Sequence, residues 1–427
     1  MSKIFTVSRG TKDILPSDTP IWQEIEKKTR QILTAYNYRE IRTPIFEQAE
    51  LFVRSAGQTT DFVQKQMLYL AAQKDGDADD IQAGELSVRP EGTAAVVRSY
   101  IENQLDKSET LSKLFYMGPM FRGERPQKGR LRQFHQIGVE AIGPNSASPY
   151  LDAEVIALAV YLLKDLGVSG FQLKLNSLGS PEDKANFAEK LRGDLKLNFS
   201  RLCFNCQNRF ERNVLRILDC KKRECQEVVR QLDLKDSYLS AESREYFAKV
   251  RQALELLKIP YEISPTLVRG LDYYTHTVFE ISHSGLGSQD ALGAGGRYNN
   301  LVSQLGGPQV DAIGFALGVE RIILALPEKT VETLKPTVFA IAMDEKSFQK
   351  AFEIVNNLRQ AAITSEINYK MGSMKSQMRA ADKSGAKFVM ILGESEMNEK
   401  VVTLKDMKSG EQEKVSWTNV VEKLKRG

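Results

Sequence analysis

The chain has 427 residues, of which 42% are hydrophobic and 27% charged, and its formal net charge is +4. This length predicts two or three domains whose cores are large enough to need no disulfide or metal, and the composition excludes a disordered or membrane-spanning chain. The N-terminus lacks the apolar core and cleavage site of a secretory signal, so we expect a cytoplasmic protein. The charge surplus is too small to indicate nucleic-acid binding by itself.

The first predicted elements are a helix and an edge strand. Residues 19–36 carry apolar side chains at helical spacing, with Pro20 in the first turn. Residues 38–46 are typical of a strand but contain Pro44, and a proline removes a hydrogen-bond donor from the sheet. We therefore expect this strand at a border such as a subunit interface; the alternative is that Pro44 simply ends it. Residues 61–70 predict a further strand.

A turn followed by a helix brings polar groups together at residues 89–93. The helix is expected to begin at Thr93, which places Arg89, Glu91 and Thr93 beside its unpaired backbone N–H groups. A carboxylate in that position suits the binding of an α-amino group. A helix-capping carboxylate is an equally good interpretation of Glu91.

Residues 114–143 predict two strands joined by a basic loop. The loop contains Arg122, Arg125, Lys128, Arg130 and Arg132. Side chains alternate along a strand, so Arg132, Phe134, Gln136, Gly138 and Glu140 share one face of the second strand. That face predicts a site for a small polar ligand, with the loop closing over an anion. A solvated sheet face is the alternative.

A cysteine-containing helical segment follows a helix at residues 150–165 and a strand at 171–175. Residues 181–259 are rich in Lys and Glu, and they hold Cys203, Cys206, Cys220 and Cys225, spaced C-x2-C-x13-C-x4-C. In a reducing compartment this clustering favours metal binding over disulfides, but the unequal gaps match a zinc ribbon poorly. We favour free thiols in an inserted subdomain, with a structural zinc as the alternative.

Three further features close the first part of the chain. Arg269, Asp272, Tyr273 and Tyr274 form a polar and aromatic cluster before a strand at residues 277–282. The glycines of residues 293–296 lack the spacing of a dinucleotide-binding loop or a P-loop, and are expected to bend a strand or admit a ligand. Arg321 lies in an otherwise apolar helix, where a phosphate would be a suitable partner and an extended path to solvent is the alternative.

Beyond Pro336 the pattern changes to alternating strands and helices. Strands are expected at residues 338–343, 366–369 and 387–392 and helices at 345–362 and 374–384, which predicts a mostly parallel sheet; two more strands and a short helix follow. A basic cluster is formed by Lys370, Lys375, Arg379, Lys383 and Lys387. It is either a contact surface for a phosphate backbone or a solvated helix face.

Several of these segments resemble one family. FRGERPQKGRLRQFHQIGVEAIG is similar to the second signature motif of class II aminoacyl-tRNA synthetases, and GFALGVERIILAL, which contains Arg321, to the third. RPEGTAAVVR and VRGLDYYTHTVFEI resemble segments particular to histidyl-tRNA synthetases, and Pro44 fits the dimer-forming first motif. The resemblance covers nearly the whole chain.

The resemblance implies an α+β catalytic core with a mainly antiparallel sheet at residues 1–180 and 260–328. It also implies a helical insertion at residues 181–259 and an α/β anticodon-binding domain at 331–427. The implied activity is the ATP-dependent formation of histidyl-adenylate and the transfer of histidine to the histidine tRNA by a homodimer, with Mg²⁺ accompanying ATP and zinc not favoured.

The resemblance also implies roles for individual residues. Arg122 and Arg269 would be catalytic, both facing the α-phosphate, Arg269 where other class members place a metal ion. The histidine-binding residues would be Glu91, Thr93, Arg122, Gln136, Glu140, Arg269, Tyr273, Tyr274 and Tyr298. The ATP-binding residues would be Arg122, Glu124, Phe134, Arg269 and Arg321. Arg125 and Gln127 would contact the acceptor end of the tRNA.

An alternative from another functional class is a catalytically silent, histidine-sensing regulatory paralog. Such proteins usually lack the C-terminal domain and part of the arginine set. Because Arg122, Arg269 and Arg321 are all present here, together with about a hundred C-terminal residues, the sequence favours the enzyme.

Overall fold

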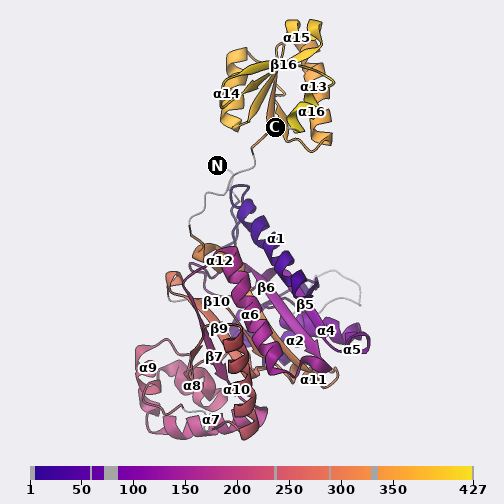
Figure 1. The fold of residues 1–427 in the computed structure, drawn as a ribbon. Coiled ribbons are helices and arrows are strands. Elements are labelled where there is room, and N and C mark those ends of the chain that lie inside the picture. Colours follow the sequence, from indigo (N-terminus) through magenta and orange to yellow (C-terminus); the bar gives the residue numbers. More distant parts are fainter. Residues whose placement is uncertain are drawn as a thin grey trace, which may run out of the picture. The chain divides into compact units, whose positions relative to one another are not determined.

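The computed structural model describes residues 5–57, 60–71, 85–234, 238–287, 290–327 and 335–425. The chain divides into two compact units, Met1–Thr330 and Val331–Gly427. Each unit has its own sheet and its own buried core, and Figure 1 labels their elements.

The main sheet of the first unit is mainly antiparallel, as predicted. Its strand order is β1-β5-β6-β11-β10-β9-β7-β8. The strands are β1 (Arg39–Glu40), β5 (Ser112–Phe121), β6 (Gln133–Gly143), β7 (Phe171–Ser177), β8 (Glu262–Ile263), β9 (Thr275–His283), β10 (Ala291–Arg297) and β11 (Asp311–Gly318). In the run β5-β6-β11-β10-β9-β7 every neighbouring pair is antiparallel, whereas the outer strands β1 and β8 run parallel to their neighbours. The predicted hairpin of β5 and β6 pairs over its whole length.

Long helices cover one face of this sheet. They are α1 (Thr19–Ala35), α6 (Pro149–Leu166) and α10 (Ala241–Leu256), and α6 packs against both others. Ser148 caps α6 before Pro149, and Gly167 in a left-handed conformation ends it, which is the usual arrangement of proline at the start and glycine at the end. The helix α10 lies within residues 181–259, the range expected for the insertion, but its buried Val250 and Leu254 belong to the same core cluster as α6.

The other face carries α4 (Thr93–Glu102), a small sheet and the insertion. The small sheet has the order β2-β4-β3, from β2 (Phe46–Gln48), β3 (Leu68–Tyr69) and β4 (Leu86–Val88). The shorter helices of this unit are α2 (Ala49–Ala56), α3 (Asp61–Gln66), α5 (Leu105–Ser108), α11 (Leu301–Gln304) and α12 (Val319–Ala325).

Two predictions for this region were wrong. The strand expected at residues 61–70 is mostly helix α3, because the Thr60 hydroxyl accepts the Val63 N–H and caps a helical turn. The strand expected at residues 38–46 is two short strands, β1 and β2, separated by a stretch outside any strand that includes Pro44; each of the two lies at an edge of its sheet, as expected. Proline has no N–H to offer a neighbouring strand, so pairing stops before it.

The insertion is built from helices that gather in one lobe next to β7 (Figure 1). They are α7 (Pro181–Lys196), η2 (Phe199–Arg201), α8 (Phe204–Arg212), η3 (Val214–Ile217) and α9 (Arg223–Val229). Ser180 and Asp183 form a capping box at the start of α7. The Asp183 carboxylate also accepts hydrogen bonds from Ser240 and Ser243, so one buried side chain ties the start of α7 to the start of α10.

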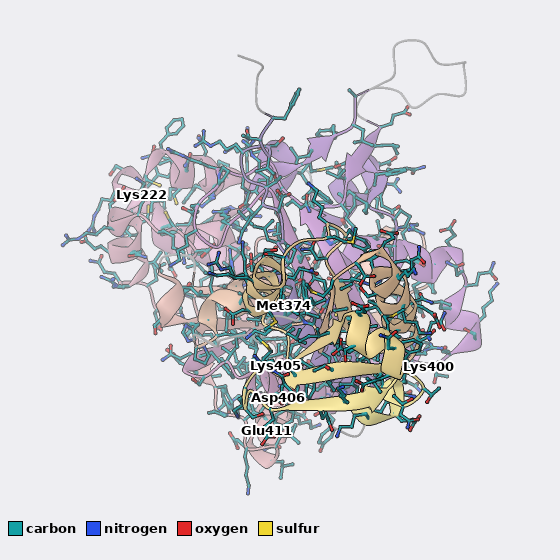
Figure 2. The ribbon with its side chains drawn as sticks, turned by 90° about the horizontal axis from the view of Figure 1, so that it is seen from above. Lys222, Met374, Lys400, Lys405, Asp406 and Glu411 are labelled. Carbon is teal, nitrogen blue, oxygen red and sulfur yellow. The ribbon has the colours of Figure 1, made fainter. Side chains whose placement is uncertain are left out.

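The second unit has a mixed sheet with the strand order β13-β12-β14-β15-β16. Its elements are β12 (Val338–Ala342), α13 (Glu345–Gln360), β13 (Ser365–Ile367), α14 (Met374–Ser384), β14 (Phe388–Leu392), α15 (Glu394–Glu399), β15 (Val401–Asp406), β16 (Gln412–Ser416) and α16 (Val420–Lys425). β12 pairs in parallel with β13 and β14, but β15 pairs antiparallel with both β14 and β16, so the expectation of a mostly parallel sheet was wrong. Asp406, labelled in Figure 2, lies at the end of β15 before the turn to β16. Its carboxylate accepts the backbone N–H groups of Lys408 and Ser409 and holds this turn.

Among the described residues, no helix is both long enough and apolar enough to cross a membrane.

Candidate active site

A cavity of about 360 Å³ opens where β6, β10 and β11 meet the start of α4, the start of α12 and the segment before β9. Predicted site residues in its wall are Glu91, Thr93, Arg122, Glu124, Phe134, Gln136, Arg269, Tyr273, Tyr274 and Arg321. These side chains come from parts of the chain more than two hundred residues apart. The antiparallel sheet is what brings them together.

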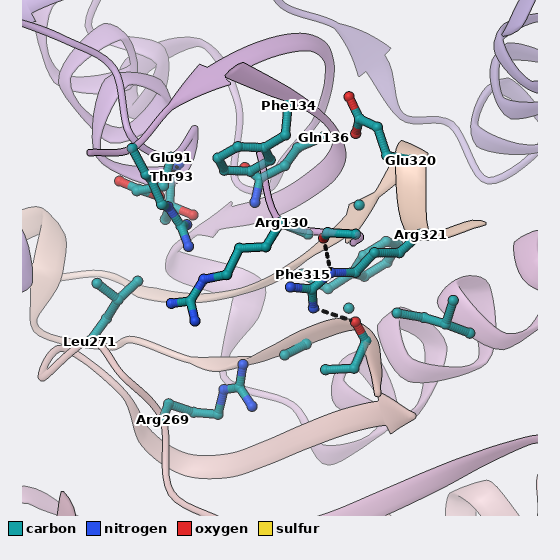
Figure 3. Close-up of a pocket in the computed structure, with 18 of the residues that line it drawn as sticks. Glu91, Thr93, Arg130, Phe134, Gln136, Arg269, Leu271, Phe315, Glu320 and Arg321 are labelled. Atoms are coloured by element: carbon teal, nitrogen blue, oxygen red, sulfur yellow. Dashed lines mark hydrogen bonds between the residues drawn. The ribbon is translucent and has the colours of Figure 1, made fainter. Parts of the chain in front are cut away.

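One end of the cavity is strongly basic. Figure 3 shows the guanidinium groups of Arg130, Arg269 and Arg321 pointing into the same space. Arg321 is held by two backbone carbonyls, since its Nε donates to Gly129 at 3.0 Å and its Nη1 to Ala291 at 2.6 Å. Burial lowers the pKa of Arg321, but a guanidinium keeps its charge at any physiological pH. Clustered guanidinium groups of this kind suit a polyphosphate.

Arg122 connects the basic end to the aromatic wall. Its Nε donates to the Pro90 carbonyl at 2.9 Å, and its guanidinium carbon lies 5.0 Å from the centre of the Phe134 ring. In this cation–π contact the Arg122 guanidinium packs against the Phe134 ring. The helix entry at Pro90 and the hairpin strand β6 therefore position each other through Arg122.

Arg269 is paired with a carboxylate at the edge of the cavity. Its Nη1 lies 2.7 Å from Glu280 on β9, while its Nε is buried and has no hydrogen-bond partner within the described part of the chain. A buried guanidinium N–H without a partner is costly. It is the kind of donor that a ligand oxygen would satisfy.

The other end of the cavity is built around Glu91, which caps α4. Its carboxylate accepts the N–H groups of Thr93 at 2.7 Å and Ala94 at 2.8 Å. Burial raises the pKa of Glu91, and the two backbone hydrogen bonds oppose that rise. Both interpretations of Glu91 from the sequence are thus compatible with the structure, because the capping carboxylate also lines the cavity.

Glu140 and Tyr298 lie behind the wall, and neither is among the residues that line it. Glu140 accepts a hydrogen bond from the Thr93 hydroxyl at 2.7 Å and another from the Tyr298 hydroxyl. Burial raises the pKa of Glu140 to about 8, so the carboxyl is mostly protonated at neutral pH. A Cβ on Gly314 of the neighbouring strand would lie 1.9 Å from Glu140 Oε2, so only glycine leaves room for this buried acid.

Two glycines make a slot for the ring of Tyr116 beneath the polar end. A Cβ on Gly92 or on Gly138 would come within 2.2 Å of Tyr116 Cζ. On β6, the same strand as Gly138, the buried Gln136 Oε1 has no hydrogen-bond partner in the described residues. The polar end thus holds an acceptor that is ready for a ligand donor.

The remaining predicted residues lie outside the cavity. Arg125 and Gln127 are exposed in the β5–β6 loop, where Gln127 pairs with Arg130 through backbone hydrogen bonds. Arg130 in turn forms an ion pair with Glu124.

The charged lining residues that the site predictions did not include are Arg130, Glu320 and Asp219. Arg130 was part of the noted basic loop, and Glu320 precedes Arg321 and accepts the His135 N–H at 2.9 Å. No local signal marks Asp219, because it reaches the cavity from the insertion.

Two family models match this chain. Residues 10–322 match the family model for histidyl-tRNA synthetase, and residues 335–427 match that for the anticodon binding domain. The chain belongs to the histidyl-tRNA synthetase family. Within this family it is 45% identical over 421 residues to the histidine--tRNA ligase of Halothermothrix orenii, covering 98% of each chain. It is 45% identical over 416 residues to that of Bacillus cytotoxicus, covering 96% of each.

Solved structures extend the comparison with histidyl-tRNA synthetases. The apo enzyme of S. aureus superimposes with a TM-score of 0.78 at 35% identity, over 99% of this chain and 100% of that one. The histidyl-tRNA synthetase of Nostoc sp. PCC 7120 has a TM-score of 0.67 at 20% identity and shares the fold. The synthetase fold, including the C-terminal unit, therefore accounts for the whole chain.

Proposed function

We propose that this chain attaches L-histidine to the histidine tRNA in two steps, with ATP as the energy source and histidyl-adenylate as the intermediate. The observation that carries this proposal is a single cavity with an arginine-rich end and a buried polar end. One end has the chemistry for a triphosphate and the other for a small zwitterion with a polar side chain.

In the first step a histidine carboxylate oxygen attacks the α-phosphorus of ATP. A new O–P bond forms, the bond from the α-phosphorus to the bridging oxygen breaks, and pyrophosphate leaves. Arg122 and Arg269 neutralise the charge that builds on the α-phosphate oxygens, with the unpartnered Nε of Arg269 as one donor. No protein nucleophile takes part, because positioning and charge neutralisation are sufficient for this reaction.

Three further residues at this end of the cavity bind ATP: Phe134, Glu124 and Arg321. Phe134 stacks on adenine, Glu124 contacts the base, and Arg321 binds the γ-phosphate. For Glu124 this requires the ion pair with Arg130 to rearrange, which would release a further guanidinium toward the phosphates. Mg²⁺ enters as part of the ATP complex.

The polar end selects histidine. Glu91 and Thr93 bind the α-amino group, while Gln136 and Tyr274 face the imidazole, with Tyr273 close by. Glu140 and Tyr298 act from behind by holding the Thr93 hydroxyl in place. An imidazole offers both a donor and an acceptor, and a buried site that pairs with both rejects side chains lacking them.

The second step transfers histidine to the terminal ribose of the tRNA and releases AMP. The exposed Arg125 and Gln127 of the β5–β6 loop contact the acceptor end, and the second unit binds the anticodon region in the cytoplasm. Basic side chains of the second unit face the phosphate backbone.

A homodimer forms through the region around Pro44. Three large apolar side chains there are exposed in the single chain: Ile45 at 47%, Phe46 at 52% and Tyr69 at 50%. They lie on or next to the small β2-β4-β3 sheet, and an exposed apolar cluster of this kind is typical of a subunit interface.

The deciding experiment is histidine-dependent exchange of pyrophosphate into ATP by the purified full chain. Exchange that requires histidine is expected. A folded chain that binds histidine but shows no exchange would instead be the regulatory paralog.

Arg269→Ala tests the assignment of this arginine. We expect a 10²- to 10³-fold loss of exchange, with histidine binding by calorimetry retained, because the arginine acts on developing phosphate charge. Arg269→Lys is expected to recover only part of the rate, since lysine lacks the forked donor geometry. Arg251→Ala, an exposed arginine on α10, is the matched control, and wild-type exchange in Arg269→Ala would overturn the role.

A further inference from the structure

The four cysteines of the insertion converge on one point. The Sγ atoms of Cys203, Cys206, Cys220 and Cys225 all lie within 4.8 Å of one another, although they are spread over more than twenty residues. Three of these side chains are buried and the fourth, Cys203, is partly buried. They are also the only four cysteines of the chain.

The spacing of the sulfurs fits a shared ligand better than a disulfide. Cys203 Sγ and Cys220 Sγ are 3.9 Å apart, whereas a disulfide brings two sulfurs to about 2.05 Å. Four sulfurs at about 2.3 Å from a central zinc are about 3.8 Å from each other at tetrahedral angles. All four cysteines are unpaired in the structure, so each sulfur is available.

The backbone around the cysteines supports thiolates. The Cys203 N–H donates to Cys225 Sγ at 3.2 Å, which ties the first and last cysteines of the set together. Lys221, Lys222 and Arg223 lie between the third and fourth cysteines, and all three are exposed. A zinc ion with four thiolates carries two net negative charges, and adjacent cations offset them.

We propose that Cys203, Cys206, Cys220 and Cys225 bind one structural Zn²⁺. This reverses the preference for free thiols drawn from the unequal sequence gaps, because the fold brings the two pairs together despite those gaps. Zinc is the metal favoured by a closed tetrahedral set of thiolates. The helices α8, η3 and α9 are short, and a metal cross-link stabilises such a segment where its own core is small.

The metal also anchors a loop that contacts the proposed catalytic segment. This loop, residues 213–219, includes the short helix η3 and lies between the second and third cysteines. Its Asn213 Nδ2 donates to Asp272 Oδ1 at 2.8 Å, and its Arg216 Nη1 donates to the Arg269 carbonyl at 3.4 Å. The last residue of the loop, Asp219, lines the cavity itself. Zinc at the base of the loop therefore helps to position Arg269.

Metal analysis of the full chain, purified without added zinc or chelator, is the direct test. We expect about one zinc per chain, released by a mercurial reagent that blocks thiols and detected with a chromogenic chelator. Cobalt added to metal-stripped protein should give the absorption of tetrahedral, thiolate-bound Co²⁺. Absence of metal with four thiols that react with a disulfide reagent, a disulfide among the four, or iron in place of zinc would each overturn the proposal.

A pair of variants separates metal binding from general loosening of the subdomain. Cys220→Ser removes a ligand and should lose the zinc. Val228→Ala removes packing from α9, where the valine is buried with 0% exposure, but leaves all four sulfurs in place and should retain the metal. Equal zinc content in both variants would overturn the site. If Cys220→Ser does not fold, stripping the wild-type chain with a chelator supplies the same comparison.

The coupling between zinc and Arg269 is tested separately. This test rests on the proposed function, whereas the metal analysis does not. Stripped wild-type protein should lose about tenfold or more in the rate of histidine-dependent pyrophosphate exchange, and stoichiometric zinc should restore it. If the chain binds zinc but stripping the metal leaves the exchange rate unchanged, the coupling to Arg269 is wrong and the metal site stands.

Discussion

Glu140→Gln probes the buried acid behind the histidine-binding wall. The carboxyl of Glu140 has 1% exposure, and its two oxygens contact the hydroxyls of Thr93 and Tyr298. Each hydroxyl can donate or accept, so a neutral acid and a glutamine side chain can make the same pair of hydrogen bonds. The variant therefore removes the titration and leaves the packing nearly unchanged.

The sign of the effect follows from the direction of the pKa change. Burial raises the pKa of Glu140 from 4.5 to about 8 in the folded chain. Below pH 4.5 both the folded and the unfolded chain are protonated at this site, and its full contribution to stability is present. As the pH rises toward 8 only the unfolded chain loses its proton, so this stabilising contribution, roughly 5 kcal/mol in all, is lost.

The assay is urea unfolding of wild type and Glu140→Gln at about pH 5.5 and about pH 8.5. The wild type should lose about 3 kcal/mol more of its free energy of unfolding over this interval than the variant does. Glu262→Gln, an exposed carboxylate on β8, is the control and should behave as wild type. Parallel pH profiles for wild type and Glu140→Gln would refute the reasoning, because they would mean that Glu140 titrates near its ordinary pKa.

Two further substitutions test the packing around the site. Asp152 and Arg297 form an ion pair at 2.8 Å, with side-chain exposures of 0% and 1%. Asp152→Asn leaves a buried guanidinium without its counter-charge and should lower the free energy of unfolding by about 3 to 5 kcal/mol. A loss below about 1 kcal/mol in urea unfolding would contradict this. Gly138→Ala should displace the Tyr116 ring, since the new Cβ would lie 2.2 Å from its Cζ, and weaken histidine binding measured by calorimetry; unchanged binding would show that the slot can widen without consequence.

The hairpin of β5 and β6 shows how far the sequence could lead. Its polar face was visible as a period of two, and Phe134 and Gln136 indeed lie side by side on the cavity wall. Glu140 shares their face of the strand but lies deeper, behind Thr93. The alternation assigns a face to a residue, whereas the depth of that residue depends on what packs above it.

The other features differ in whether a local sequence signal or a long-range contact determines them. The helix α3 has a local signal in the sequence, because Thr60 is a good N-cap. Asp219 was not open to prediction, since nothing near it in the sequence says that the insertion reaches the cavity. The convergence of the four cysteines could not be predicted for the same reason, because the sequence does not determine the path of the chain between the second and third cysteines.

The insertion holds the segment before β9 from two sides. Lys184 on α7 donates to the carbonyls of Asp272 at 2.7 Å and Tyr274 at 3.1 Å, and Asn213 of the same subdomain donates to the Asp272 carboxylate. Binding energies at connected sites are reciprocal. A substrate that favours one position of residues 269–274 must therefore also favour one position of the insertion, and protection of α7 amides from hydrogen exchange should rise when histidine binds.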